Sequence, residues 1–361
     1  MSEHLRILLV VGPSTGGIGR HVHTVAGEMV RRGHDVAVVG PAASAATFDW
    51  AATGAAFVPA PIGGASPRAL RRATAMLRRA AAERDVVHAH GVRTGAVAAA
   101  ARLRPLVVTW HNGPHDRWRR RLAHPALEQL VARRADLTLT VSADLSNRAA
   151  RAGARAVETV VVVAPPLPSA GRSPEAVRSE LGVGARPLVL AVGRLEPQKR
   201  IDVLVDALAG WPGPVSPVAV VAGTGSLEAD LRRQIERTGA PVRLLGRRED
   251  VADLMTAADV VVLPSAWEGY PLVAQEALRA GTALIATPVG GVPDLVGPAA
   301  LLVPAGDPHA LQLALRHLVE DPAERRRLGA AGRERAHTWP TTEQMVDRLA
   351  QIYLDLTSRS S

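Results

Sequence analysis

The sequence predicts an α/β protein with two doubly wound domains, each built on a parallel sheet. Short continuous apolar runs recur along the chain and alternate with helical patterns, which is typical of strands buried on both faces. Both halves begin alike, because the runs at residues 5–11 and 187–192 each lead into a glycine-containing turn and then a helix. The length of 361 residues is too great for one ordinary core and suits two.

The predicted strands are these apolar runs. The first, at residues 5–11, is followed by Gly16-Gly17-Ile18-Gly19, which we expect as a loop between this strand and the first helix. Further strands are expected at residues 35–39, 86–88, 106–109, 137–141, 160–163, 187–192, 218–221, 242–244, 260–263 and 283–285.

The domain boundary is expected where periodicity stops. Residues 164–174 hold four prolines and a glycine without a regular pattern, which indicates a linker. We therefore expect a first domain at residues 1–165, a linker at 166–174 and a second domain at 175–340.

The composition excludes several classes of protein. Hydrophobic residues at 47% and charged residues at 21% are globular values. The absence of cysteine excludes disulfides, thiolate nucleophiles and cysteine-ligated zinc, and it fits a cytoplasmic location. No apolar run approaches the roughly 18 residues of a membrane span, and the opening segment fits a strand better than a secretory signal. A net charge of +9 predicts attraction to nucleotide diphosphates, acidic lipid or nucleic acid.

Two glutamates eight residues apart are the most informative feature. Pro271 suits the first turn of a helix and Gly281 its end, so residues 272–280 are predicted to be helical. Glu268 then lies in the preceding loop and Glu276 on the second turn. Backbone N–H groups at the start of a helix favour a diphosphate. We expect Glu268 to bind sugar hydroxyls and Glu276 a ribose diol, whereas two solvated surface glutamates are the alternative.

Residues 268–276 resemble the Glu-x7-Glu motif of glycosyltransferase family 4, which has the GT-B fold. Other segments agree with the family in order over nearly the whole chain, at residues 16–22, 85–90, 108–112, 192–199, 222–225 and 258–265. The resemblance implies two Rossmann-like domains facing a central cleft and a donor held mostly by the second. It also implies retention of anomeric configuration and a last helix, within residues 341–361, that returns to the first domain.

Arg194 and Lys199 follow the apolar run at residues 187–192, at the carboxyl end of a parallel sheet where ligands bind. In the family the matching pair clamps the donor diphosphate. Lys199 is the only lysine in a chain whose other basic residues are arginines, apart from histidine. Because lysine is a compact point charge and arginine a planar fork, this choice favours a functional role over a surface residue before a helix.

The resemblance implies further contacts with the donor. Gly17 is placed beside the diphosphate with the acceptor nearby, although a glycine-rich turn alone equally suggests a dinucleotide site. His111 is implied to contact the transferred sugar or its phosphates, and His90 has a similar setting at the end of a strand. A hydrogen-bonded structural histidine is the alternative for both. The resemblance also implies that Gly223 lies near the diphosphate and that backbone groups around Arg248 contact the base. The remaining donor residues are Gly269, Tyr270, Leu272 and Val273.

Metal and cofactor sites are not expected. The sequence has no Asp-x-Asp motif, and no cluster of His, Asp or Glu has metal-ligand spacing. Arg194, Lys199 and the predicted helix start at residue 272 would then neutralise the leaving group. Retention without an evident carboxylate nucleophile resembles the front-face route of the family, in which the departing phosphate oxygen takes the proton of the acceptor. Double displacement stays open.

Two arginine-rich stretches lie in the first half. We expect them to be solvated faces, with peripheral contact to an anionic membrane as the alternative. Nucleic acid is not expected to bind, because no stacking aromatic residues interleave with the arginines. The stretches contain Arg71, Arg72, Arg78 and Arg79, and then Arg117, Arg119, Arg120 and Arg121 around Trp118.

The sequence therefore predicts a retaining, metal-independent hexosyltransferase. Its donor is expected to be a UDP-hexose or GDP-mannose, and its acceptor a hydroxyl of a lipid, a glycan or a small molecule. One alternative is a nucleotide-sugar epimerase of related fold, against which the two glutamates, Arg194 and Lys199 argue together. Another is a non-catalytic basic protein that binds a membrane or a partner, against which the intact donor motifs argue.

Overall fold

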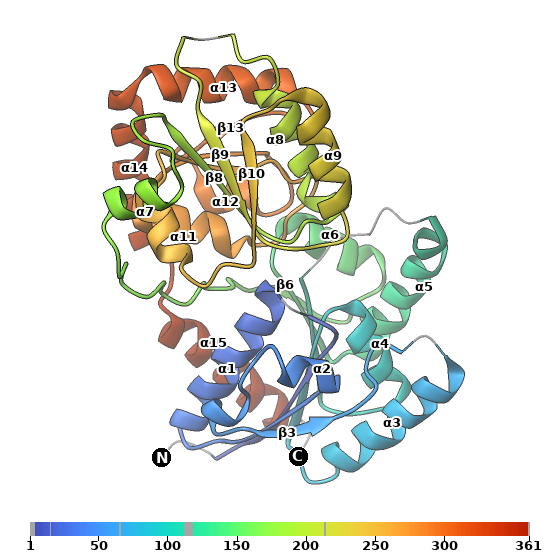
Figure 1. Ribbon diagram of the computed structural model, residues 1–361. Helices are drawn as coiled ribbons and strands as arrows, with labels where there is room; N and C mark the ends of the chain where they lie inside the picture. The colour runs from blue at the N-terminus through green and yellow to red at the C-terminus, as the bar shows by residue number, and fades with distance from the viewer. Residues whose placement is uncertain (1–3, 15, 65, 112–117, 213, 360–361) are drawn as a thin grey trace. The chain divides into compact units, whose positions relative to one another are not determined.

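The computed structural model describes residues 4–14, 16–64, 66–111, 118–212 and 214–359, with side chains of residues 118–123 excepted. The chain divides into two compact units (Figure 1). Unit 1 comprises Met1–Pro165 together with Pro340–Ser361, and unit 2 comprises Pro166–Trp339. Each unit carries its own parallel sheet.

Unit 1 is built on a seven-stranded sheet in the order β3-β2-β1-β4-β5-β6-β7. All neighbouring strands are parallel, and β1 lies between β2 and β4. The chain therefore reverses its direction of strand addition at β1 and β4, which is where doubly wound sheets bind ligands. The strands are β1 (Arg6–Val11), β2 (Asp35–Gly40), β3 (Ala56–Pro59), β4 (Val86–His90), β5 (Leu106–Trp110), β6 (Leu137–Thr140) and β7 (Val157–Thr159).

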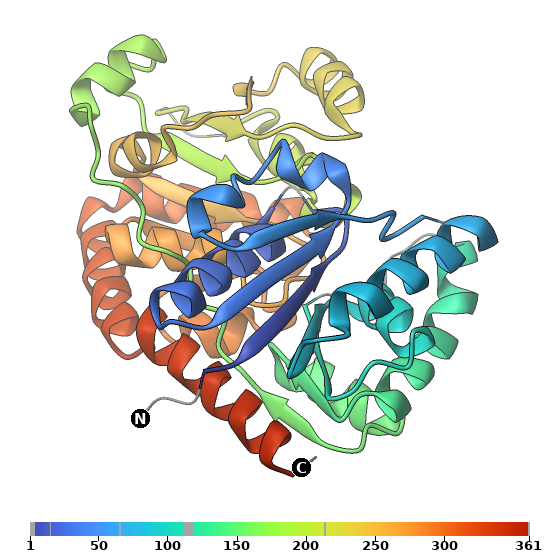
Figure 2. The ribbon, with the colours of Figure 1, turned by 90° about the horizontal axis from the view of Figure 1, so that it is seen from below.

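Helices cover both faces of this sheet. The helix α15 returns to unit 1 after unit 2 and packs against α1 and β4, as Figure 2 shows for the red α15 and the blue α1. A capping box of Thr341 and Gln344 fixes its start, and its apolar side chains join the core around β1. The helices are α1 (Gly17–Arg31), α2 (Ala42–Ala45), α3 (Pro67–Ala81), α4 (Val92–Ala100), α5 (Trp118–Arg134), α6 (Ala143–Arg151) and α15 (Thr342–Ser358), with a 3-10 turn η1 (Ala51–Thr53).

Unit 2 is built on a six-stranded parallel sheet in the order β10-β9-β8-β11-β12-β13, and its direction reverses at β8 and β11. Separate apolar clusters pack on the two faces of the sheet. The strands are β8 (Leu188–Val192), β9 (Val218–Ala222), β10 (Val242–Gly246), β11 (Val260–Leu263), β12 (Ala283–Ala286) and β13 (Leu301–Leu302). The helices are α7 (Pro174–Glu180), α8 (Ile201–Leu208), α9 (Glu228–Thr238), α10 (Val251–Ala257), α11 (Leu272–Ala280), α12 (Val292–Val296), α13 (Pro308–Glu320) and α14 (Pro322–His337), with a 3-10 turn η2 (Pro197–Lys199).

The predicted fold class is confirmed, and two local predictions are wrong. Residues 160–163 were expected as a strand, but β7 ends at Thr159. The valines here are apolar because they pack on the core around α15, and the Val163 amide donates to Met345 Sδ rather than to a strand. The expected loop at residues 16–19 is also shorter, since α1 already begins at Gly17. No helix in the described part of the chain is long and apolar enough to span a membrane.

Candidate functional site

The charged centre of unit 2 is an ion pair between Lys199 and Glu268. Lys199 ends the η2 turn after β8, and Glu268 lies in the loop after β11, so the pair sits where the sheet reverses. Lys199 Nζ lies 2.6 Å from Glu268 Oε1, and their side chains are 18% and 8% exposed. Ser265 Oγ donates to the same oxygen at 2.6 Å. The sequence placed both residues at this edge of the sheet, and the structure joins them directly.

Both members of this pair keep capacity to bind a ligand. An ammonium group has three hydrogens, and in the described part of the chain only one of those on Lys199 has a partner. Glu268 Oε2 likewise receives no hydrogen bond from any described residue, while Oε1 receives two. The pair therefore offers N–H donors to an anion and a carboxylate oxygen to a hydroxyl, side by side.

The loop that carries Glu268 is held by a second loop. The amide of Gly291 donates to the carbonyl oxygens of Glu268 and Gly269, at 3.2 and 3.0 Å. Gly290 has φ +54°, and a Cβ there would lie 1.7 Å from the Glu268 carbonyl oxygen. Only glycine allows this approach without a shift of the backbone. Gly290 and Gly291 were not predicted from the sequence, although a glycine pair after a strand is a signal for such a turn.

The helix α11 follows this loop directly. It begins at Leu272, no side chain caps its N-terminus, and Pro271 precedes it in an extended conformation. Its first-turn amides therefore keep the anion-binding character of a helix start. Glu276 lies on this helix and is 2% exposed. Leu272 is buried, whereas Val273 and Tyr270 are partly buried against the core of unit 2.

The glycine turns after β8 and β9 contact each other. Gly193 donates to the Ala222 carbonyl at 3.0 Å, and Gly223 donates to the Gly246 carbonyl at 2.7 Å. A Cβ on Gly223 would lie 1.8 Å from the Gly193 carbonyl oxygen, so this close approach of two backbones itself requires glycine. Arg194 lies between these turns and Lys199 and is exposed, and its side chain has no hydrogen bond or ion pair with a described residue.

Arg248 belongs to a network of charges beside the end of β10. Its guanidinium donates to both oxygens of Asp250, at 2.7 and 2.6 Å, and to Glu180 at 3.0 Å. These hydrogen bonds raise the pKa of Arg248 and lower that of Asp250. Arg172 joins the network through Glu180 and Asp250, and it also donates to Asp253. The side chain of Arg248 is thus occupied, which leaves its backbone for the predicted contact with a base.

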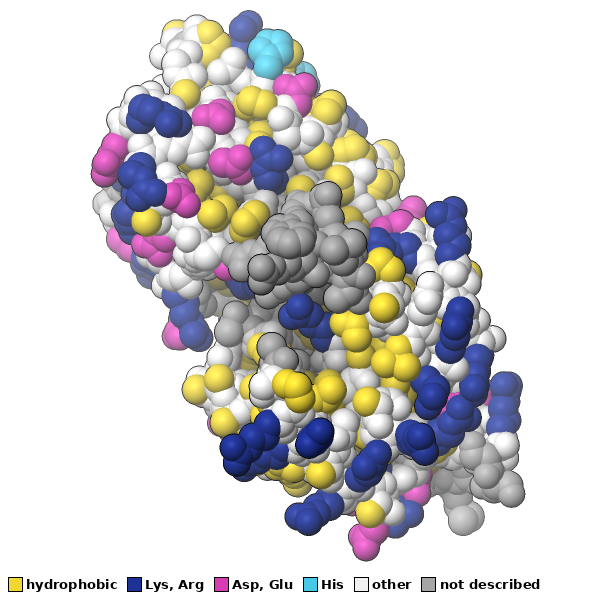
Figure 3. All heavy atoms as spheres, turned by 90° about the vertical axis from the view of Figure 1, so that its right-hand side faces the viewer, with side chains coloured by type: hydrophobic (Ala, Val, Ile, Leu, Met, Phe, Trp, Pro, Cys, Tyr) yellow, Lys and Arg dark blue, Asp and Glu magenta, His cyan; other side chains and the backbone are white. Residues whose placement is uncertain are grey.

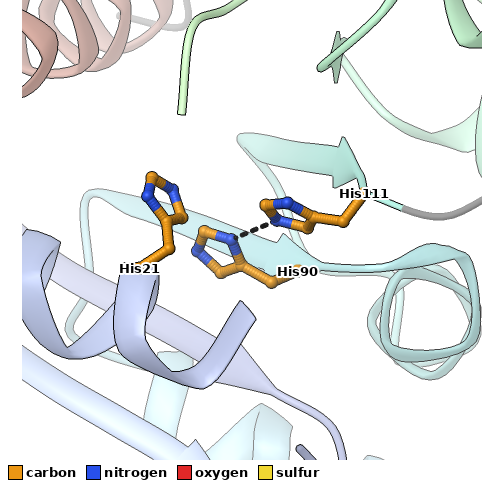
Figure 4. A group of neighbouring side chains, drawn as sticks. All are labelled: His21, His90 and His111. Atoms are coloured by element: carbon orange, nitrogen blue, oxygen red, sulfur yellow. Dashed lines mark hydrogen bonds between the residues drawn. The ribbon is translucent and has the colours of Figure 1, made fainter. Parts of the chain in front are cut away.

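Three buried histidines meet at the corresponding edge of unit 1 (Figure 4). His21 comes from α1, His90 is the last residue of β4, and His111 follows β5. One ring nitrogen of each lies within 4.8 Å of those of the others. His90 Nδ1 and His111 Nε2 form a hydrogen bond of 3.1 Å. The sequence singled out His111 and His90 but not His21, and it showed no metal-ligand spacing because these residues meet only through the fold. That the enzyme needs no metal stays a prediction.

Burial keeps these imidazoles neutral. Desolvation lowers the pKa of His21 to about 4, and that of His90 and His111 well below the usual value. His88 lies beside them in β4, where Tyr353 Oη and Thr109 Oγ1 bond its two nitrogens at 2.6 and 2.7 Å. His88 is therefore the fully satisfied structural histidine of this region. Gly17 is exposed at the first position of α1, one turn before His21.

Two family models match the chain over most of its length. The model of glycosyl transferases group 1 matches residues 174–335, and the glycosyl transferase 4-like domain matches residues 16–166. D-inositol 3-phosphate glycosyltransferase 1 of Catenulispora acidiphila is 31% identical over 321 residues, covering 80% of this chain and 77% of that protein. The chain belongs to glycosyltransferase family 4. It is also 29% identical to the glycogen synthase of Mycobacterium tuberculosis, over 94% of this chain and 91% of that enzyme.

Matches with solved structures show that this glycosyltransferase has the GT-B fold. The structure of HepE from Anabaena in complex with UDP and glucose matches with a TM-score of 0.83 and 23% identity, covering 98% of this chain and all of that one. At this identity the likeness supports the fold alone. The substrates of this glycosyltransferase have to be argued from its own residues.

The arginines of α3 form an exposed basic face of the glycosyltransferase, and Figure 3 shows basic side chains gathered over this side of unit 1. Trp118 and the arginines around it, Arg117 to Arg121, have side chains outside the described residues. A solvated face stays the prediction and contact with an anionic membrane the alternative, and sedimentation with liposomes at low salt, with and without acidic lipid, would distinguish them. The exposed residues of α3 include Arg68, Arg71, Arg72, Arg78 and Arg79.

Proposed function

We propose that the protein is a retaining hexosyltransferase that moves a hexose from a nucleotide diphosphate sugar to a hydroxyl acceptor without a metal. The observation that carries the proposal is the Lys199–Glu268 pair at the reversal of the unit 2 sheet. Its free N–H donors suit a diphosphate, and its free carboxylate oxygen suits a sugar hydroxyl. A nucleotide sugar presents these two chemical groups next to each other.

The remaining donor contacts extend from this pair. The first-turn amides of α11 would receive the phosphates, and the buried Glu276 would accept hydrogen bonds from the ribose diol. Arg194, exposed beside the pair, would close on the phosphate from the other side. UDP-glucose is the first donor to test, because HepE has been solved with UDP and glucose. GDP-mannose is the second, since nothing in the Arg248 region selects a base by its side chain.

The charge of the leaving group would be neutralised by protein groups alone. Lys199 and the start of α11 are donors fixed before the reaction, which is the arrangement that stabilises developing charge most effectively, and Arg194 would join them when it closes on the phosphate. In the front-face route, the bond from the anomeric carbon to the phosphate oxygen breaks while the bond to the acceptor oxygen forms on the same face. The departing phosphate oxygen takes the acceptor's proton. His111 would contact the sugar or its phosphates as a neutral hydrogen-bonding group.

A screen of nucleotide sugars in EDTA tests this proposal. The protein is incubated with UDP-glucose, UDP-galactose, UDP-GlcNAc and GDP-mannose, with and without polyol, glycan and lipid acceptors, and release of UDP or GDP is measured. We expect release from one donor, faster with an acceptor, and a product that keeps the anomeric configuration. Turnover only with added Mg²⁺ or Mn²⁺ would reject the metal-free route. Conversion of the sugar at C2 with no transfer would instead identify an epimerase.

A further inference from the structure

The histidine cluster of unit 1 offers a set of metal ligands that the proposed sugar transfer does not require. His21, His90 and His111 are 4%, 2% and 7% exposed and come from three different elements. Figure 4 shows their rings converging on one space, and no carboxylate joins the group among the described residues. His21 Nδ1 and His90 Nε2 are buried without a hydrogen-bond partner. A buried polar atom without a partner destabilises the fold, and an ion bound by His90 Nδ1, His111 Nε2 and His21 Nδ1 would give the His21 nitrogen a partner.

We propose that His21, His90 and His111 bind a divalent ion of the zinc, nickel and copper class. We further propose that this ion withdraws His111 from the donor and so inhibits the enzyme. The second part rests on the function proposed above, whereas the binding site itself does not.

The geometry fits three ligands of one ion. Two nitrogens bound to a tetrahedral zinc ion lie roughly 3.3 Å apart, because the Zn–N bond is about 2.0–2.1 Å. His90 Nδ1 and His111 Nε2 are already 3.1 Å apart. The centroid of the His21 ring lies 5.6 Å from that of His90 and 5.5 Å from that of His111, and one nitrogen of His21 lies within 4.8 Å of a nitrogen of each. Three protein ligands leave a fourth position open.

The donor set selects the type of ion. Imidazole nitrogen suits zinc, nickel and copper, whereas magnesium, calcium and manganese require oxygen ligands. The site is therefore compatible with a transferase whose chemistry needs no magnesium or manganese. One of the two nitrogens that share the 3.1 Å hydrogen bond carries its proton, so that imidazole has to change tautomer when an ion binds both. One member of the cluster, His21, also lines a cavity of about 220 Å³ together with Thr109 and residues of α15.

Binding is tested on the whole protein after EDTA treatment and without any donor. Co²⁺ alone is the probe, followed by the visible absorption of its four-coordinate form, and Zn²⁺ is then titrated in competition. We expect one ion per chain. Loss of a supporting partner already weakens metal sites 10–100-fold, so H21Q and H90Q should each weaken binding at least about 100-fold. The control is H23Q, two residues along α1, whose ring bonds the Asp49 carbonyl instead.

The two variants keep the test decisive if one of them folds poorly, since H21Q alone suffices when its circular dichroism matches that of the wild type. Equal binding by H21Q and H23Q would overturn the site, because the ion would then bind surface histidines. Inhibition is measured separately as the zinc concentration that halves each variant's own zinc-free transfer rate. We expect this concentration to rise at least about 100-fold in H21Q. Zinc that binds the cluster without slowing transfer would overturn the inhibitory link and leave the site standing.

Discussion

The two units place opposite kinds of polar group at the same point of the same type of sheet. In unit 2, the reversal at β8 and β11 carries an ion pair, Lys199 with Glu268, and charged networks continue beside it. In unit 1, the reversal at β1 and β4 carries buried neutral imidazoles. The same topology thus provides a binding edge in both units. The side chains at that edge determine whether it attracts an anion or offers nitrogen lone pairs to a metal ion.

The largest effect is expected from removing the lysine of the ionic edge. Lys199→Ala should lower kcat roughly 10²–10³-fold, because it removes a fixed donor to the leaving group and leaves Glu268 with Ser265 alone. Initial rates at saturating donor measure this change. The control is Arg237→Ala, an exposed cation at the end of α9, which should keep the wild-type rate. A wild-type kcat in Lys199→Ala would show that the leaving group does not bind at this pair.

The next effect tests the loop that holds Glu268. Gly290→Ala should reduce kcat/KM about 10²-fold, because its Cβ would meet the Glu268 carbonyl oxygen at 1.7 Å and a displacement of about 1 Å can have this effect on catalysis. Gly210→Ala is a matched control, since Gly210 has φ +58° and nothing near its Cβ. Both variants should lose about 1–2 kcal/mol of stability to the left-handed backbone, but only the first should lose activity.

Glu276→Ala should mainly weaken nucleotide binding. The dissociation constant of UDP or GDP is expected to rise roughly 10–100-fold, because hydrogen bonds to a charged group contribute about 1.5–3 kcal/mol. Isothermal titration measures it, and kcat at saturating donor should change less. Glu236→Ala, an exposed carboxylate on α9, is the control. Equal affinities of the two variants would exclude Glu276 from the nucleotide site.

A smaller effect is expected at the neutral edge of unit 1. Tyr353→Phe removes the hydroxyl that bonds His88 Nδ1 at 2.6 Å and leaves a buried imidazole nitrogen without a partner. The free energy of unfolding should fall by about 1–3 kcal/mol. Denaturant unfolding measures it, with the exposed Gln351→Ala on the same helix as control. An unchanged midpoint would mean that water satisfies His88 equally well.

The smallest effect is expected on acidification, from the carboxylate of Asp253 in unit 2. The hydrogen bond from Arg172 lowers the pKa of Asp253 in the folded protein, so below about pH 4 the unfolded chain binds more protons than the folded one. The stabilising contribution of Asp253 is thus present above about pH 4 and is lost as the pH falls through its folded pKa. Asp253→Asn should flatten this part of the stability curve, measured by thermal unfolding from pH 6 to 3, while the exposed Asp230→Asn should not.

Local patterns in the sequence predicted most of the fold. Strands buried on both faces are continuous apolar runs. Pro271 and Gly281 predict the bounds of α11, Leu272–Ala280, and the structure has the same bounds. The same pattern failed at residues 160–163, because packing on α15 demands apolar residues just as a strand does. An apolar run indicates that a segment is buried. Whether the segment is also a strand depends on whether it pairs with a neighbouring strand or packs on a helix.

The site was predictable to the extent that it depends on strand ends. Lys199 and Glu268 could be placed at one edge, but their contact required the order of β8 and β11, which sequence periodicity does not contain. The histidine cluster was missed for the same reason. His90 and His111 were both placed at strand ends, and β4 and β5 do pair directly, with His90 opposite Thr109. His21 lay within residues 16–22, which match the family, but nothing in that segment singled it out as a site residue.

The return of α15 makes the sequence of one unit discontinuous. Unit 1 consists of two segments, Met1–Pro165 and Pro340–Ser361, whereas unit 2 is the single continuous segment Pro166–Trp339 between them. A fragment cut after unit 2 would strip Met345, Leu349 and Tyr353 from the core of unit 1 and expose its apolar face. During translation the ribosome makes unit 2 before α15. The core of unit 2 can therefore form before that of unit 1, which is complete only when α15 has been made.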